Sequence, residues 1–178
     1  MNICLYGAAR DTVPEVYIKS IHELGRELAH RGHTMVFGGG MTGMMGAAAR
    51  GVREAGGHMI GVAPRFFHTP GILVEDSGEL IFTDTMRQRK QIMEDLSQAF
   101  IAVPGGIGTL DEFFEIFTLR SLGQHGKPVA LYNVNGYFDE LIAFLKKAEA
   151  ETFIGPELWD CISIFTDLDS LFSYLEGI

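Results

Sequence analysis

Short apolar segments alternate along the chain with longer segments whose apolar residues recur every three or four positions. The short segments have the length of buried strands, and the longer ones have the period of amphipathic helices. We predict strands at 2–6, 34–37, 59–63, 80–82, 99–103, 128–132 and 162–165, and helices at 14–31, 47–55, 84–97, 109–122, 137–150 and 167–175. This alternation indicates βαβ units and an α/β fold with a doubly wound, mostly parallel sheet flanked by helices.

Residues 65–78 show neither period and contain Pro70, Gly71 and Gly78, so we predict a surface loop there. No linker, repeat or charge block divides the 178 residues. We therefore expect one domain over residues 1–178, long enough to bury a substantial core.

The charge balance restricts the class of partner. The net charge of −9 argues against a nucleic-acid polymer, which requires clustered Lys and Arg, but it leaves a single nucleotide possible. No apolar run approaches the length of a membrane span, so we expect no membrane partner. Cys4 and Cys161 have no metal or disulfide spacing, and the histidines show no ligand spacing. We expect a cytoplasmic protein with no metal and no cofactor.

Residues 103–112, Val-Pro-Gly-Gly-Ile-Gly-Thr-Leu-Asp-Glu, join the predicted strand 99–103 to a helix. A strand, a glycine-rich turn and a helix start present free N–H groups and the positive end of a helix dipole, which favour a phosphate. Three glycines exceed what a tight turn needs, and no Walker lysine follows them. We therefore predict a phosphate-binding turn.

A second glycine cluster, Gly38 to Gly46, follows the predicted strand 34–37. Its start matches the dinucleotide fingerprint G-x-G-x-x-G, but no acid for a ribose hydroxyl follows the next strand. Tight packing of helix against strand explains these glycines at least as well as ligand contact. We include Gly39, Gly40 and Gly43 among the candidate residues as one wall of the pocket.

Acidic side chains inside the helix 109–122 suggest more than phosphate binding. Glu112, Glu115 and Thr118 are spaced by three residues, and we predict that they form a sugar-binding row. Complementing the helix dipole is the common role of such acids, but Asp111 could serve it alone. Arg89 lies beside an apolar helix face and needs an anionic partner, for which Glu112 or a substrate phosphate would serve.

These motifs resemble those of the Lonely Guy family, the cytokinin riboside 5′-monophosphate phosphoribohydrolases, whose bacterial members were often labelled possible lysine decarboxylases. "PGGIGTLDE" at 104–112 matches the family's PGGxGTxxE, and "MRQRKQIM" at 86–93 matches M-x-x-R-K-x-x-M. Residues 37–46 and 123–145 agree as well. The first turn, Gly7 to Arg10, lacks the family's Ser-rich form. The loop 65–78 also differs and is a candidate lining of the base pocket.

The resemblance implies a Rossmann-like fold and hydrolysis of the N-glycosidic bond of a nucleoside 5′-monophosphate, AMP or an N6-modified cytokinin riboside monophosphate. The products would be the free base and ribose 5-phosphate. It implies Arg89 and Glu112 as the catalytic pair and a homodimer with the pocket near the interface. The predicted substrate-binding residues are Gly39, Gly40, Gly43, Lys90, Gly105, Gly106, Ile107, Gly108, Thr109, Leu110, Asp111, Glu115 and Thr118.

Two other classes of function remain open. A non-catalytic nucleotide or cofactor carrier on the same fold would keep the glycine turn but would not need Arg89 and Glu112 together. A decarboxylase that uses pyridoxal phosphate would need a Schiff-base lysine. Of the five lysines, only Lys90 lies near the motifs.

Overall fold

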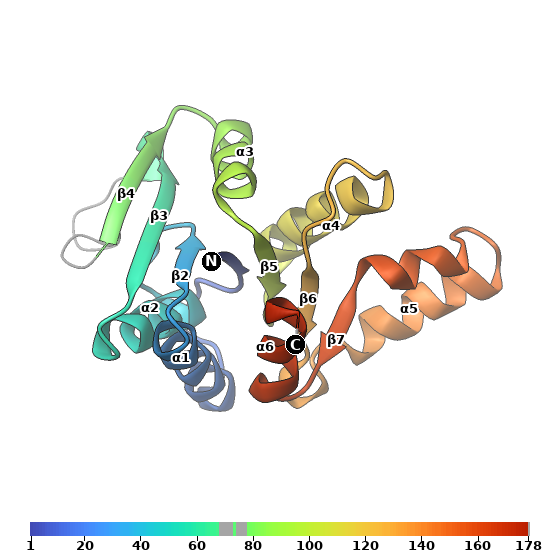
Figure 1. Cartoon of the computed structure of the whole chain (residues 1–178), viewed down its shortest axis with the longest axis horizontal. Coiled ribbons are helices and arrows are strands. Elements are labelled where there is room, and N and C mark those ends of the chain that lie inside the picture. The colour runs from blue at the N-terminus through green and yellow to red at the C-terminus, as the bar shows by residue number, and fades with distance from the viewer. Residues whose placement is uncertain (68–72, 74–77, 178) are drawn as a thin grey trace.

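The computed structural model describes residues 1–67, 73 and 78–177 and contains a seven-stranded sheet with helices on both faces (Figure 1). All neighbouring strands are parallel, in the spatial order β4-β3-β2-β1-β5-β6-β7. The predicted Rossmann-like α/β fold is therefore confirmed. The strands are β1 (Asn2–Tyr6), β2 (Thr34–Phe37), β3 (His58–Pro64), β4 (Gly78–Thr83), β5 (Ala99–Ala102), β6 (Val129–Tyr132) and β7 (Ser163–Phe165).

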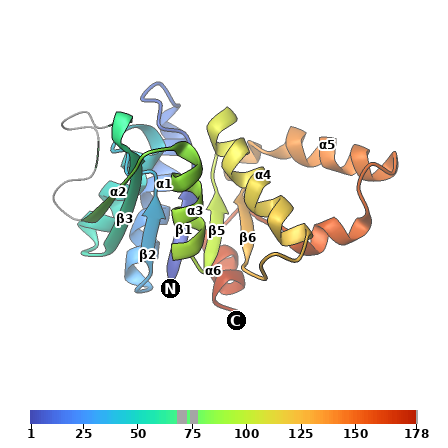
Figure 2. The same ribbon diagram turned by 90° about the horizontal axis from the view of Figure 1, so that it is seen from above.

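The helices form two layers, one on each face of the sheet. They are α1 (Glu15–His30), α2 (Gly43–Glu54), α3 (Met86–Leu96), α4 (Ile107–Ser121), α5 (Asp139–Ala150) and α6 (Leu168–Glu176). Side chains of α1, α2 and α6 share one hydrophobic cluster, and those of α3 and α4 share the other. Figure 2 shows α3 and α4 side by side over the same face. None of the described helices is long and apolar enough to cross a bilayer.

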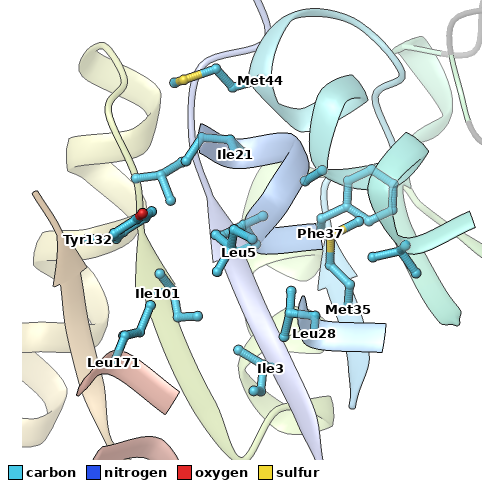
Figure 3. Close-up of a cluster of buried hydrophobic side chains, with 14 of the residues drawn as sticks. Ile3, Leu5, Ile21, Leu28, Met35, Phe37, Met44, Ile101, Tyr132 and Leu171 are labelled. Atoms are coloured by element: carbon cyan, nitrogen blue, oxygen red, sulfur yellow. The ribbon is translucent and has the colours of Figure 1, made fainter. Parts of the chain in front are cut away.

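Strand β1 supplies both cores because it lies in the middle of the sheet. Ile3 and Leu5 point into the cluster under α1, α2 and α6, which Figure 3 shows together with Met35 and Phe37. Cys4 and Tyr6 point into the opposite cluster. Successive side chains of a strand face opposite sides, so a strand covered on both faces reads as one continuous apolar run.

The direction in which the chain adds strands reverses between β1 and β5. Strands β2, β3 and β4 follow β1 on one side, whereas β6 and β7 follow β5 on the other. At such a switch point the connections diverge and leave a crevice beyond the carboxyl ends of the two strands. The connections that begin at Gly7 and at Val103 border it.

Several helix and strand ends differ from the prediction. Helix α4 begins at Ile107 rather than at 109, and α2 begins at Gly43 rather than at 47. Apolar periodicity misses these first turns because glycines contribute no side chain to the pattern. Strands β3 and β4 are longer than predicted, and a 3₁₀ turn at Pro156–Cys161 was not foreseen.

The predicted loop 65–78 is only partly described. Arg65–Phe67 form a 3₁₀ turn, Leu73 makes an isolated bridge with Gly40, and Gly78 belongs to β4 rather than to the loop. Residues 68–72 and 74–77, on which the prediction of a base-pocket lining mainly falls, lie outside the described residues.

Helices α1 and α2 approach so closely that only glycine fits at two contact points. A Cβ at Gly25 would overlap the carbonyl oxygen of Ala48, and one at Gly51 would overlap that of His22. Both glycines are buried. The contact holds α2 against the sheet and so positions the residues that precede it.

Replacing Gly25 by Ala should therefore destabilise the protein. Alanine improves helix propensity by about 1 kcal/mol, but the overlap with a backbone oxygen forces the helices apart. We expect a net loss of about 1–3 kcal/mol in the free energy of unfolding, measured by urea denaturation. Gly126→Ala is the control, because a Cβ there meets no atom within 4 Å. Equal stability of the two variants would contradict this account.

Candidate active site

A cavity of about 430 Å³ lies at the switch point. It is lined by the turn after β1, the turn after β5, and the first turns of α3 and α4. The lining residues are Gly7, Ala8, Ala9, Arg10, Phe67, Met86, Arg89, Gly106, Ile107, Gly108, Thr109, Asp111 and Glu112. Five of the predicted substrate-binding residues share this cavity with Arg89 and Glu112, namely Gly106, Ile107, Gly108, Thr109 and Asp111.

The start of α4 offers free hydrogen-bond donors to this cavity. Gly106 is the N-cap residue and provides no side-chain cap. The first backbone bond of the helix runs from Leu110 N to Gly106 O, at 3.0 Å. In the part of the chain that the structure describes, the N–H groups of Ile107, Gly108 and Thr109 find no acceptor. Free donors at the positive end of a helix dipole favour an anion.

The glycines of this turn have different roles. A Cβ at Gly105 would overlap the side chain of Thr109, so Gly105 permits tight packing within the turn. A Cβ at Gly106 or Gly108 would meet no atom within 4 Å. These two glycines leave open space above the backbone, through which a ligand can reach the N–H groups.

The start of α2 is already satisfied from within the protein. Gly43 N donates to Asp11 Oδ1 at 3.0 Å, and Met44 N and Met45 N donate to Ala8 O at 3.0 and 3.3 Å. These bonds occupy the donors that an anion would need. The start of α2 therefore anchors the turn after β1, and of these two helix starts it is that of α4 that has free donors.

None of Gly39, Gly40 and Gly43 is among the residues that line the cavity. Gly39 and Gly43 adopt left-handed backbone conformations, with φ of 77° and 56°. A Cβ at Gly43 would also come within 2.6 Å of Arg10 O. The packing explanation accounts for these glycines, and their assignment to the substrate stays a prediction.

Arg89 and Glu112 form an ion pair at the inner end of the cavity. Arg89 Nη1 lies 2.6 Å from Glu112 Oε1, and Arg89 Nε donates to Val62 O at 3.0 Å. The exposed fractions of the two side chains are 12% and 11%. A Cβ at Gly38 would overlap Arg89 Nη2, so glycine there makes room for the guanidinium. Of the two anionic partners expected for Arg89, Glu112 or a substrate phosphate, the structure shows Glu112.

Burial and charge oppose each other at Glu112. Burial raises the pKa of its carboxyl above the ordinary value, and Arg89 acts to lower it. Beneath the pair, burial raises the pKa of Cys4 to about 12 and raises that of Tyr6 as well. Cys4 is therefore a neutral core thiol, and Glu112 is the carboxylate that balances Arg89.

The predicted row of Glu112, Glu115 and Thr118 is divided between two surfaces. Glu112 lines the inner cavity, whereas Glu115 and Thr118 line an outer groove of about 550 Å³ with Lys90 and Leu110. Each three-residue step rotates a side chain by about 60° back around the helix axis, so the row cannot keep to one face. The binding roles of Lys90, Leu110, Glu115 and Thr118 stay predictions.

Six of the lining residues were absent from the list of predicted site residues, and three of them have larger side chains than Gly7, Ala8 and Ala9. Arg10 follows β1, Phe67 ends the turn after β3, and Met86 begins α3. The sequence contained a signal for Arg10, because it lies just beyond the carboxyl end of a predicted strand. Phe67 belongs to the predicted loop 65–78, which was a candidate lining of the base pocket although Phe67 was not itself among the predicted site residues.

Comparisons of the sequence with known proteins relate it to a described family and to individual enzymes. The family described as "Possible lysine decarboxylase" matches residues 45–175. The chain is 42% identical over 153 residues to a probable cytokinin riboside 5′-monophosphate phosphoribohydrolase of Oryza sativa subsp. japonica, covering 86% of this chain and 72% of that protein. It is 43% identical over 155 residues to the cytokinin riboside 5′-monophosphate phosphoribohydrolase of Mycobacterium tuberculosis, covering 87% and 82%.

Solved structures share the fold. A molybdenum cofactor binding protein from Rippkaea orientalis superposes with a TM-score of 0.75 at 23% identity, covering 99% of this chain and 95% of that one. The molybdenum cofactor carrier protein of Chlamydomonas reinhardtii has a TM-score of 0.73 at 25% identity, covering 99% and 96%.

The ion pair predicts a pH-dependent effect on stability. Arg89→Met removes the charge that lowers the pKa of Glu112, so that pKa rises further above its unfolded value. A carboxyl with a raised folded pKa costs stability above that pKa, and the cost disappears as the pH falls through it. We expect Arg89→Met to lose about 3 kcal/mol at neutral pH and to recover part of this loss at about pH 5.

Urea unfolding of wild type and variant at the two pH values measures this effect. Arg87→Met, an exposed change on the same helix, is the control and should be close to neutral at both. A deficit of Arg89→Met that is the same at both pH values would argue against a buried Glu112 carboxylate as its cause.

Proposed function

The chain belongs to the possible lysine decarboxylase, or Lonely Guy, family, and we propose that it hydrolyses nucleoside 5′-monophosphates to the free base and ribose 5-phosphate. The substrate class is AMP or an N6-modified cytokinin riboside monophosphate, after the names of the curated relatives. The observation that carries the proposal is the Arg89–Glu112 ion pair, which lies in one cavity with the free donors of α4.

The start of α4 would bind the 5′-phosphate through the N–H groups of Ile107, Gly108 and Thr109. Glu112 follows Gly108 by four residues, a rise of about 6 Å along the helix. A phosphate at the helix start therefore leaves the ribose near the carboxylate. Binding energy from the phosphate is then used to orient the reacting sugar.

Cleavage of the glycosidic bond places positive charge on the ribose ring. The bond between C1′ and the base nitrogen breaks, and its electron pair leaves with the base. A water oxygen forms the new bond to C1′ and gives up a proton, and the base takes up one proton on the nitrogen that held C1′, so that it leaves as the neutral free base. The Glu112 carboxylate stabilises the cation or directs this water, and Arg89 orients the carboxylate and opposes the rise in its pKa that burial causes.

Decarboxylation through a Schiff base is disfavoured by the surroundings of Lys90. Its Nζ lies 2.5 Å from Glu115 Oε2 and 3.1 Å from Asp111 Oδ2. The hydrogen bond to Glu115 is the main cause of a raised pKa of Lys90. A Schiff-base lysine needs the opposite shift, because only the neutral amine attacks a carbonyl.

A carrier without chemistry is the alternative from another class, since the proteins of similar fold include a molybdenum cofactor binding protein and a molybdenum cofactor carrier protein. A carrier requires donors for an anionic ligand, which α4 supplies. It has no need for a buried carboxylate held by an arginine, and a buried ion pair is costly unless it has a use. The Arg89–Glu112 pair therefore favours the hydrolase.

Glu112→Gln and Arg89→Ala should each reduce release of free adenine from AMP by at least about 100-fold. Glutamine keeps the shape of Glu112 but cannot stabilise a cation by charge. Chromatography of the free base measures the rate, and circular dichroism checks that both variants are folded. The matched control is Glu140→Gln, an exposed carboxylate on α5. Near-normal turnover in a folded Glu112→Gln variant, or no base release by wild type, would refute the assignment.

We also propose a homodimer that covers the outer groove of α4. Ile107 is 84% exposed and Leu122 is 66% exposed at the two ends of this helix, and Phe114 and Leu119 line the groove between them. An apolar helix face of this kind is typical of a subunit interface. A dimer there would bring the interface close to the cavity, since Ile107 and Asp111 line both. A cytoplasmic location remains our expectation.

Leu122→Glu should convert the dimer to a monomer, because it places a charge in the apolar interface without touching the core. Analytical ultracentrifugation over a range of concentrations measures the mass. Phe144→Glu, an equally exposed change on α5, is the control. A monomeric wild type, or an unchanged dimer in Leu122→Glu, would exclude this interface.

A further inference from the structure

Arg10 is a cation that lines the cavity without a partner. In the described part of the chain, Arg10 and Arg89 are the cationic side chains of the lining, and Arg89 is paired with Glu112. Arg10 makes no hydrogen bond or ion pair through its side chain there. We propose that Arg10 binds the 5′-phosphate of the substrate and selects phosphorylated nucleosides over nucleosides. The inference rests on the proposed function and adds a specificity residue to it.

The backbone around Arg10 is held in place before any ligand binds. Ala8 N donates to Pro104 O at 3.2 Å, which ties the turn after β1 to the turn after β5. Thr42 Oγ1 donates to Ala9 O at 2.8 Å, and Asp11 accepts from Gly43 N. The turn is thus anchored on both sides of Arg10, and only its side chain must order on binding.

Arg10 lines the same two pockets as Gly106 at the start of α4, so Arg10 and this helix start can contact one bound anion. Besides the main cavity, Arg10 lines a neighbouring pocket of about 240 Å³, and Ala8 and Gly106 also belong to both. Arg10 and the helix start therefore border the cavity from two adjacent turns. A guanidinium offers paired donors that match two phosphate oxygens.

The charges of the cavity explain why a further cation is needed. Asp111 and Glu112 line it, and the whole chain has a net charge of −9. A phosphomonoester carries about −1.5 to −2 charges at neutral pH, and the partial charge of a helix start is only about +0.5. Lys90 is engaged by Asp111 and Glu115. Arg10 is the described lining residue that can supply the missing positive charge.

Arg10→Ala should raise the KM for AMP by about 10-fold or more, and it should leave the affinity for adenosine, which carries no phosphate, unchanged. Arg10→Lys should keep part of the affinity that Arg10→Ala loses, because lysine retains the positive charge but lacks the paired N–H donors of the guanidinium. Arg53→Ala removes an exposed arginine at the end of α2 and is the matched control. An unchanged KM for AMP, or an equal rise in KM for AMP and adenosine, would overturn the proposal.

Calorimetric titration with ribose 5-phosphate and with ribose separates this inference from the proposed function. Arg10→Ala should weaken binding of ribose 5-phosphate by a similar factor and should not affect ribose. Absent binding of ribose 5-phosphate by wild type, or equal binding by wild type and variant, overturns the role of Arg10. If wild type releases no base but Arg10→Ala loses affinity for ribose 5-phosphate, the hydrolase proposal fails and the phosphate contact stands.

Discussion

The ion pair between Arg89 and Glu112 is the interaction on which the geometry of the site depends. It joins α3 to α4 across the carboxyl ends of β1 and β5, and Arg89 reaches the backbone of β3 through Val62. Taking both charges out of water is costly unless each is fully paired. The guanidinium of Arg89 is paired with the Glu112 carboxylate and with the carbonyl oxygen of Val62. Glycine at position 38 leaves the space that the guanidinium occupies.

Two helix starts of similar sequence serve opposite purposes. Both α2 and α4 follow a parallel strand through a glycine-rich segment. The donors at the start of α2 are occupied by Ala8 and Asp11, so this helix anchors a turn. The donors at the start of α4 remain free and face a cavity. A glycine-rich motif thus indicates that another group lies close to the backbone, but that group can be part of the protein or a ligand.

The same fold accommodates different functions, and the side chains around the cavity distinguish them. A molybdenum cofactor binding protein and a molybdenum cofactor carrier protein superpose over nearly the whole chain at 23% and 25% identity. Fold alone therefore does not determine chemistry. The proposed division of labour is local: free N–H groups and Arg10 for the phosphate, and Glu112 held by Arg89 for the sugar. Both parts lie in one cavity because the sheet reverses its winding there.

The sequence by itself determined the architecture, since the periods of strand and helix are local properties of the chain. Alternating apolar segments such as 2–6 and 99–103 were enough to predict a parallel sheet, and the need of Arg89 for an anion pointed to Glu112. The tertiary structure decided which groups share a surface. It separated Glu115 and Thr118 from Glu112, left α4 open while closing α2, and brought Arg10 to the cavity. Contacts between distant segments depend on how helices pack on the sheet, and no local pattern encodes that geometry.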